Sequence, residues 1–189
     1  MALPFQYIQE IECEFVSPEI AFSMVKPLDL FFCCGTDPVA KIIEGVTHSP
    51  ISHCGFAFPD GATIESTFLG GVHIGNLCDY LGGSDGPCII GRLAGMDDVN
   101  RDALGLLAYE QIGKKYEVTE EIQQLMDKLG MLKHVAARWT KLYCSALVQD
   151  VLRRTPWEIP DDPTGANATP ADVWRQTFVD PVVATWERR

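Results

Sequence analysis

The chain has 189 residues, a length that suits one folded domain, and 47% of them are hydrophobic, which excludes disordered and collagen-like classes. It carries 15 basic and 26 acidic side chains, a formal net charge of −11. That charge repels phosphate backbones and anionic lipid surfaces, so we expect neither a nucleic-acid partner nor a polybasic membrane contact. No run approaches the roughly 20 apolar residues of a bilayer-spanning helix, so no integral membrane segment is expected.

The N-terminal stretch and the cysteines indicate a reducing compartment. The stretch has no basic start, and Glu10, Glu12 and Glu14 interrupt it where a signal peptide would be apolar, so we expect a cytoplasmic chain without an export signal. The seven cysteines are an odd number and include no CxxC pair. A disulfide framework, a closed zinc site and a cofactor are therefore not expected, and most of the cysteines are interpreted as small buried hydrophobic residues.

Apolar patterning and turn residues then predict the elements in chain order. The first half is predicted to hold strands at 27–34, 51–58, 62–68 with a continuation at 72–74, and 88–93, and a helix that begins at Thr36 or Asp37. From Asp98 the spacing of the apolar residues becomes that of a helix. Helices are predicted at 98–112, 117–139, 143–154 and 169–178, and Gly113 is expected to end the first of them. This layout indicates the α+β class. We expect a single domain over residues 1–189, with an N-terminal extension at 1–26 and a helical insertion at about 117–141.

Three residues have the chemistry of a thiol nucleophile and its support. Cys144 lies at the predicted start of a helix, where the macrodipole favours a thiolate. His53 lies on a predicted strand, and Glu65 follows 12 residues later across the turn Pro59-Asp60-Gly61. A hairpin of that length places both side chains on one face, where the carboxylate can orient the imidazole toward the thiol.

The motifs around these residues resemble the YiiX/YaeF-like group of permuted NlpC/P60 proteins. The first string, Asp29-Leu30-Phe31-Phe32, and the later Ile51-Ser52-His53-Cys54-Gly55-Phe56 are similar to that group's "GDI" and "SHVGI" patterns. Ile112-Gly113-Lys114-Lys115-Tyr116 is similar to "LGKPYD", and Leu142-Tyr143-Cys144-Ser145-Ala146-Leu147-Val148 to "YCSELV". Thr169-Pro170-Ala171-Asp172-Val173 is similar to a terminal "SPADL". The resemblance covers about residues 27–175 in the family's order.

The resemblance implies a circularly permuted papain-like fold, an antiparallel sheet or small barrel packed against helices. It also implies Cys144 as nucleophile, His53 as base and Glu65 as the group that orients the base. Tyr116 and Ser145 are then candidate substrate-binding residues, and the backbone N–H of Cys144 is the expected oxyanion donor. Two positions depart from the family pattern. Ala146 replaces a frequent Glu and Lys115 replaces a Pro, which weakens any inference about the substrate.

The remaining histidines and cysteines are interpreted as structural. His73 lies beyond the Gly70-Gly71 break and outside the family's His motif. His48 precedes Ser49-Pro50 in a predicted loop, and His134 is a lone histidine in the extra helical segment. Alternation on a strand sends the side chains of Cys33 and Cys34 to opposite faces, which disfavours a redox pair. By the same rule Cys54, next to His53, is expected to point away from the cleft into the core.

Three functions remain open. The first is a cysteine peptidase or amidase that cleaves a peptide, isopeptide or cell-wall-type amide through a thioester acyl-enzyme. The second is a lipid acyltransferase or deacylase acting on an acyl-lipid substrate, since relatives of the lecithin–retinol acyltransferase kind share the permuted fold but carry His where this chain has Glu65. The third is an inactive binding module, which has no need of all three residues together.

Overall fold

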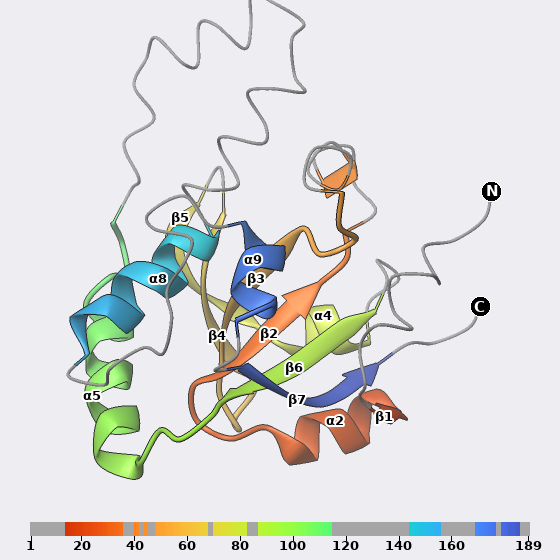
Figure 1. The fold of residues 1–189 in the computed structure, drawn as a ribbon, viewed down its shortest axis with the longest axis horizontal. Helices are drawn as coiled ribbons and strands as arrows, with labels where there is room; N and C mark the ends of the chain where they lie inside the picture. The colour runs from red at the N-terminus through yellow and green to blue at the C-terminus, as the bar shows by residue number, and fades with distance from the viewer. Residues whose placement is uncertain are drawn as a thin grey trace, which may run out of the picture.

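A computed structural model describes residues 14–35, 40, 41, 44, 48–67, 70–82, 87–114, 144–155, 169–176 and 179–185. They form one seven-stranded sheet with helices packed on it (Figure 1). In chain order the elements are β1 (Glu14–Val16), α2 (Pro18–Met24), β2 (Asp29–Cys33), β3 (His53–Ala57), β4 (Ala62–Thr67), β5 (Gly71–Asn76), α4 (Cys78–Leu81), β6 (Cys88–Leu93), α5 (Asp98–Tyr109), α8 (Cys144–Arg154), α9 (Pro170–Trp174) and β7 (Val179–Thr185). The strand order is β1-β7-β6-β2-β3-β4-β5, antiparallel except between β1 and β7. The predicted α+β class is confirmed.

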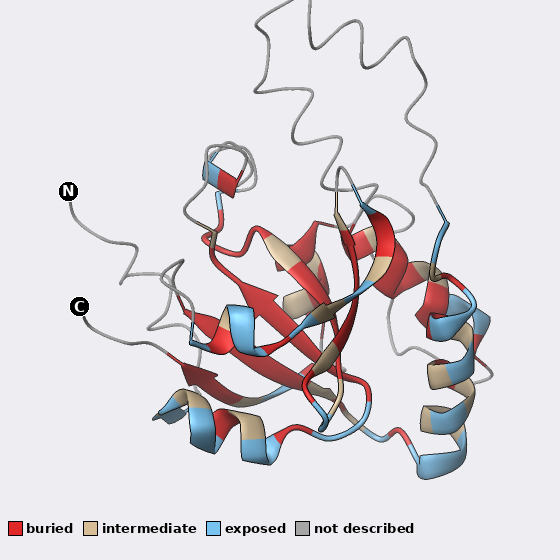
Figure 2. Ribbon diagram, turned by 180° about the vertical axis from the view of Figure 1, so that it is seen from behind, coloured by how far each residue is buried: buried red, intermediate tan, exposed pale blue. Residues whose placement is uncertain are grey.

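The sheet is buried on both faces because its side chains alternate between two apolar layers. On the central strand β2, Leu30 and Phe32 pack with α5, α8 and α9, whereas Phe31 and Cys33 pack with α2 and α4. All five residues of β2 are buried, which explains why its sequence is a continuous apolar run. Figure 2 shows the buried sheet and the exposed outer surfaces of α2 and α5. Among the described residues, no helix has the length and apolar character needed to cross a bilayer.

Several predicted elements are found close to their expected bounds. β6 coincides with the strand predicted at 88–93, and β3 and β4 lie within the strands predicted at 51–58 and 62–68. α5 begins after Asp97, whose side chain accepts a hydrogen bond from the Asn100 backbone N–H at 2.8 Å. Thr169 and Asp172 form a capping box at the start of α9, with Pro170 as the first helical residue.

Three sequence predictions differ from the structure. Residues 72–74 do not continue β4. They belong to β5, which returns antiparallel to it, and Gly71 at φ 62° adopts a left-handed conformation that suits the reversal. α9 ends at Trp174 and not at residue 178. α5 ends at Tyr109 and not at residue 112.

The patterning did not anticipate four elements: β1, α2, α4 and β7. β1 and α2 lie within the range expected to be an extension, yet β1 pairs with β7, and Ala21 of α2 packs into the layer that contains Phe31. Most of the helix predicted after Gly35 lies outside the described residues. The same holds for the insertion predicted at about 117–141 and for three single residues, Tyr116, His134 and Cys13.

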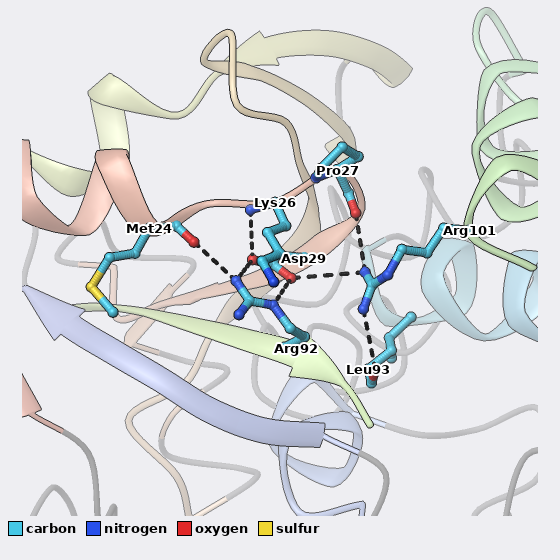
Figure 3. Close-up of polar contacts among 7 residues, drawn as sticks. All are labelled: Met24, Lys26, Pro27, Asp29, Arg92, Leu93 and Arg101. Carbon is cyan, nitrogen blue, oxygen red and sulfur yellow. Dashed lines mark hydrogen bonds and ion pairs between the residues drawn. The ribbon is translucent and has the colours of Figure 1, made fainter. Parts of the chain in front are cut away.

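A buried ion pair fastens the sheet at the start of β2 (Figure 3). Asp29 is fully buried, and its two carboxylate oxygens accept bonds from Arg92 of β6 at 2.9 and 2.7 Å. The backbone N–H of Lys26 donates to the same carboxylate at 2.9 Å, and Arg101 of α5 lies 4.0 Å away. This cluster joins β2, β6 and α5 and satisfies a charge that would otherwise be costly to bury.

Candidate active site

His53 and Glu65 form a close polar pair on neighbouring strands. Glu65 lies directly opposite Gly55 in the register of β3 and β4, so His53, two residues earlier, has its side chain on the same face. The Nε2 atom of His53 lies 2.7 Å from Oε2 of Glu65, and their side chains are 19% and 2% exposed. Because Nε2 faces the carboxylate, Nδ1 is the ring nitrogen left for a further partner.

The Glu65 carboxylate is held by two more side chains. Thr63 donates its hydroxyl to Oε1 at 2.8 Å, and the Tyr80 hydroxyl donates to Oε2, the oxygen that also faces His53. Burial raises the pKa of Glu65, but the hydrogen bond and charge of His53, followed by the bonds from Tyr80 and Thr63, lower it to about 2. Glu65 is therefore a buried carboxylate that stays ionised because donors surround it.

Two glycines make room for this arrangement. A Cβ added at Gly55 would lie 2.7 Å from the ring of Phe31 and 3.1 Å from Cβ of Glu65. A Cβ added at Gly75 would lie 2.0 Å from Oε1 of Glu65 and 2.6 Å from the Thr63 hydroxyl. The carboxylate thus occupies the space that a side chain on β5 would fill.

Cys144 brings its thiol to this pair from the start of α8, which packs against β3 and β4. The residue is 2% exposed, and its thiol has hydrogen bonds with the side chains of His53 and Cys54. The hydrogen bond from the Cys54 thiol lowers the pKa of Cys144. Burial raises this pKa, but the hydrogen bond and the charge of His53 lower it, and so does a hydrogen bond from the backbone N–H of Cys54. The pKa of Cys144 therefore lies well below the usual value of a cysteine thiol. The first turn of a helix also favours an anion at this position.

His53 is shifted in the complementary direction. Burial lowers the pKa of its imidazole, but the bonds and charges of Cys144 and Glu65 raise it to about 10. Both shifts favour a proton on His53 over one on Cys144, which is the direction of a thiolate–imidazolium pair.

The other buried cysteines behave in the opposite way. Burial raises the pKa of Cys33, Cys34, Cys54 and Cys88. Cys144 is the exception among the described buried thiols because it alone has both a charged imidazole and donors directed at its sulfur. No disulfide bond joins the six described cysteines, Cys78 and Cys144 among them.

The structure also places three other residues considered in the sequence analysis, Ser145, His73 and His48. Ser145 is fully buried in the first turn of α8, and Tyr116 lies outside the described residues. His73 lies opposite Glu65 on β5, where its Nδ1 is 3.0 Å from the carbonyl oxygen of Gly71. His48 is exposed before β3.

Sequence reasoning missed Cys54 and Tyr80. Cys54 was expected to point away from the cleft. It does lie in the core layer beneath α8, but Cys144 belongs to the same layer, so their thiols meet. His53 is the first residue of β3, and a sulfur at the start of α8 can therefore contact both neighbours. Tyr80 is in a helix of four residues, too short for any periodic pattern to reveal it.

Within the described part of the chain, no three His, Cys, Asp or Glu side chains are arranged to hold a metal ion. The polar atoms of His53 and Glu65 are directed at each other rather than at a common point. The described residues therefore form no metal centre.

Comparison with known proteins gives a likeness of fold. No protein-family model matches the chain, and no curated protein matches it in sequence. The solved structure of the metalloprotein YiiX (DUF1105) from Escherichia coli O157:H7 is similar at a TM-score of 0.50 and 19% identity. The match covers 86% of this chain and 98% of that one. The chain therefore has a YiiX-like fold.

Proposed function

We propose that this protein is a thiol hydrolase with a permuted papain-like architecture of the NlpC/P60 kind. Cys144 is its nucleophile, His53 its acid and base, and Glu65 the group that orients His53. One observation carries the proposal: the single described buried cysteine with a lowered pKa contacts an imidazole whose Nε2 is held 2.7 Å from a buried carboxylate. Acyl transfer requires a nucleophile in contact with a base, and a carboxylate in contact with that base to orient it.

The reaction follows from the protonation states. The Cys144 thiolate attacks the carbonyl carbon of an amide, and the carbonyl π electrons move onto the oxygen, which the N-terminal end of α8 stabilises electrostatically. The imidazolium of His53 then gives its proton to the leaving amine as the C–N bond breaks, which leaves a thioester on Cys144. Neutral His53 next removes a proton from a water molecule, and the water oxygen attacks the carbonyl carbon of the thioester. The carbon–sulfur bond then breaks, which releases the carboxylic acid and restores the Cys144 thiolate.

Glu65 has a role in both steps. While His53 is charged, the carboxylate stabilises the imidazolium. While His53 is neutral, the carboxylate accepts a hydrogen bond from Nε2–H and keeps Nδ1 free for proton exchange. Peptide, isopeptide and cell-wall-type amides all offer the necessary carbonyl, and an acyl-lipid ester is the alternative substrate. Separate libraries of amides and esters, with release of the amine or alcohol as the readout, distinguish the two classes.

The name of the solved neighbour calls YiiX a metalloprotein. Because the described residues of this chain provide no fitting ligand set, the proposed reaction contains no metal-dependent step. We expect chelator treatment to leave the alkylation rate of Cys144 unchanged.

The proposal is tested by iodoacetamide labelling as a function of pH, with peptide mapping of each cysteine. At pH about 6.5 an unperturbed thiol of pKa about 8.5 is only about 1% thiolate, whereas a thiol with a strongly lowered pKa is thiolate to a much larger extent. After allowance for the lower nucleophilicity of an acidic thiolate, Cys144 is expected to react about 10- to 100-fold faster than exposed Cys78.

Two variants and a control complete the test. His53→Ala is expected to slow the labelling of Cys144 near pH 6.5 by about 10- to 100-fold, and Glu65→Gln by less, because the imidazole remains. His73→Ala is the matched control, since His73 is also a partly buried histidine but is bonded to a backbone carbonyl. A wild-type Cys144 that titrates like a free thiol, or another cysteine that labels first, would remove the basis of the proposed enzyme and favour a binding module.

A further inference from the structure

Tyr80 is connected to the catalytic groups through one carboxylate oxygen. Its hydroxyl donates to Oε2 of Glu65, and His53 approaches the same oxygen at 2.7 Å. The contacts therefore form a chain from the Cys144 thiol through His53 and Glu65 to Tyr80. The direction of Oε2 depends on where the Tyr80 hydroxyl is held.

The fold fixes the position of the Tyr80 ring. α4 follows β5 directly, and the Asn76 side chain accepts a hydrogen bond from the Cys78 backbone N–H at 3.0 Å. Leu77, fully buried, accepts the backbone N–H of Tyr80 at 3.0 Å. The ring of Tyr80 stacks on Phe31 with centroids 4.7 Å apart and an interplanar angle of 28°. A side chain packed on one face and anchored at both ends has little freedom to redirect its hydroxyl.

The ring also lies beside the imidazole. Its centroid is 5.7 Å from that of His53, and Phe31 approaches His53 at 5.6 Å from another side. The Tyr80 ring is tilted by 33° to the imidazole, and the Phe31 ring meets the imidazole at an interplanar angle of 61°. Tyr80 therefore contributes a hydroxyl to Glu65 and ring packing to His53, and these contributions can be separated by substitution.

The hydroxyl of Tyr80 remains a hydrogen-bond donor at the pH of the labelling experiments. Burial and the negative charge of Glu65 raise the pKa of Tyr80 above its ordinary value, so the phenol stays protonated. The other titratable groups that act on it are Cys33 of β2 and Asp79 of α4, and both raise its pKa further. A neutral donor beside a buried carboxylate is a stable arrangement.

We propose that Tyr80 is a positioning residue, which aims Oε2 of Glu65 at His53 and thereby keeps Nδ1 of His53 directed at Cys144. This inference rests on the proposed function, and it assigns the support of the site to an element outside the motifs around His53, Glu65 and Cys144. Thr63 has a lesser part because it holds Oε1, the oxygen that does not face His53.

The test compares Tyr80→Phe with Tyr109→Phe and Thr63→Val by the pH profile of Cys144 alkylation. Tyr80→Phe keeps the stacked ring and removes only the hydroxyl. A lost hydrogen bond to a charged group typically weakens the equilibrium that it supports about 10-fold or more. We expect labelling near pH 6.5 to fall by about 10-fold, with the profile moved to higher pH, and a smaller loss for Thr63→Val. Tyr109, 50% exposed and on α5, provides the matched Tyr→Phe control and is expected to leave the profile unchanged.

The results distinguish this inference from the proposed function. If wild-type Cys144 is reactive but Tyr80→Phe labels like Tyr109→Phe, or its profile moves to lower pH, the positioning role of Tyr80 is wrong while the enzyme stands. If wild-type Cys144 is itself unreactive, the proposed function fails first. Circular dichroism checks the folding of each variant. Should Tyr80→Phe not fold, proton NMR of the wild type decides: hydrogen-bonded protons of His53 and Tyr80 at Glu65 should give downfield resonances that disappear in Glu65→Gln, and their absence overturns the inference.

Discussion

A single methyl group added at Gly75 should disable the site without replacing any residue of the proposed triad. Gly75 lies on β5 opposite Thr63, and its backbone is not in the left-handed region, so alanine is acceptable to the main chain. The added Cβ of Gly75→Ala, however, would lie 2.0 Å from Oε1 of Glu65. An ordinary contact begins at 3.4 Å, so the two groups must separate by about 3.4 − 2.0 = 1.4 Å.

That displacement is large compared with the contacts it disturbs. The bonds of Glu65 to His53 and Thr63 are 2.7 and 2.8 Å long, and a shift of the carboxylate by about 1 Å takes them beyond hydrogen-bonding distance. Overpacking typically costs about 1–3 kcal/mol, and each lost bond to a charged group about 1.5–3 kcal/mol, partly recovered by relaxation. We therefore expect Gly75→Ala to lower the free energy of unfolding by about 2–4 kcal/mol, which for a domain of this size lowers Tm by roughly 4–16 °C.

The reactivity of Cys144 should fall together with the stability. A misplacement of about 1 Å at a catalytic group can cost about 100-fold in rate, so labelling of Cys144 near pH 6.5 should fall by that order while the protein remains folded. Gly105→Ala on α5 is the matched control. Its Cβ would lie 3.4 Å from the nearest atom of Leu28, and alanine in a helix gains about 0.5–1 kcal/mol over glycine.

The assay is alkylation of Cys144 followed by peptide mapping, with thermal unfolding by circular dichroism on the same samples. Wild-type labelling by a folded Gly75→Ala variant would refute the reasoning, because Glu65 would then not need its position beside β5. Equal losses in Gly75→Ala and Gly105→Ala would refute it too, since only the first substitution meets the carboxylate.

Two further predictions concern the ion pair of Asp29 with Arg92 and the thiol of Cys54, which contacts Cys144. Asp29→Asn breaks the ion pair between the fully buried Asp29 and the partly buried Arg92 and should destabilise the fold by about 3 kcal/mol by urea unfolding. Asp150→Asn removes an exposed ion pair and should cost less than about 0.5 kcal/mol, and equal effects of the two substitutions would contradict the structural role of the Asp29–Arg92 pair. Cys54→Ala removes the first donor to Cys144, so the pKa of Cys144 should rise and its labelling profile move to higher pH, and an unchanged midpoint would show that His53 alone sets it.

The sequence could predict the His53–Glu65 pair because local rules decide it. A tight turn at Pro59-Asp60-Gly61 joins β3 to β4, and a short hairpin has few registers that keep both faces buried. An even separation of 12 residues then places the two side chains on one face, and the structure brings them to 2.7 Å. The catalytic roles of these residues remain predictions, since geometry alone does not show turnover.

What the sequence could not predict depends on contacts between distant segments. The hydroxyl of Tyr80 meets Glu65 only because β5 returns beside β4 and α4 then folds back over the sheet. The β5 strand was mistaken for a continuation of β4, since apolar residues on either side of two glycines fit one broken strand as well as two paired ones. Without that reversal, Tyr80 has no visible connection to the site.

Cys54 shows where a correct local rule led to a wrong conclusion. Strand alternation does send the side chains of His53 and Cys54 to opposite faces of β3. The inference that only one of them could reach the nucleophile assumed that the nucleophile approaches one face of the sheet. Cys144 instead lies at the start of α8, in the same layer as Cys54 and beside the first residue of β3. At the end of a strand both faces open onto the same sulfur, so the imidazole of His53 and the thiol of Cys54 act on it together. Cys54, next to the proposed base, therefore helps to set the charge of the proposed nucleophile.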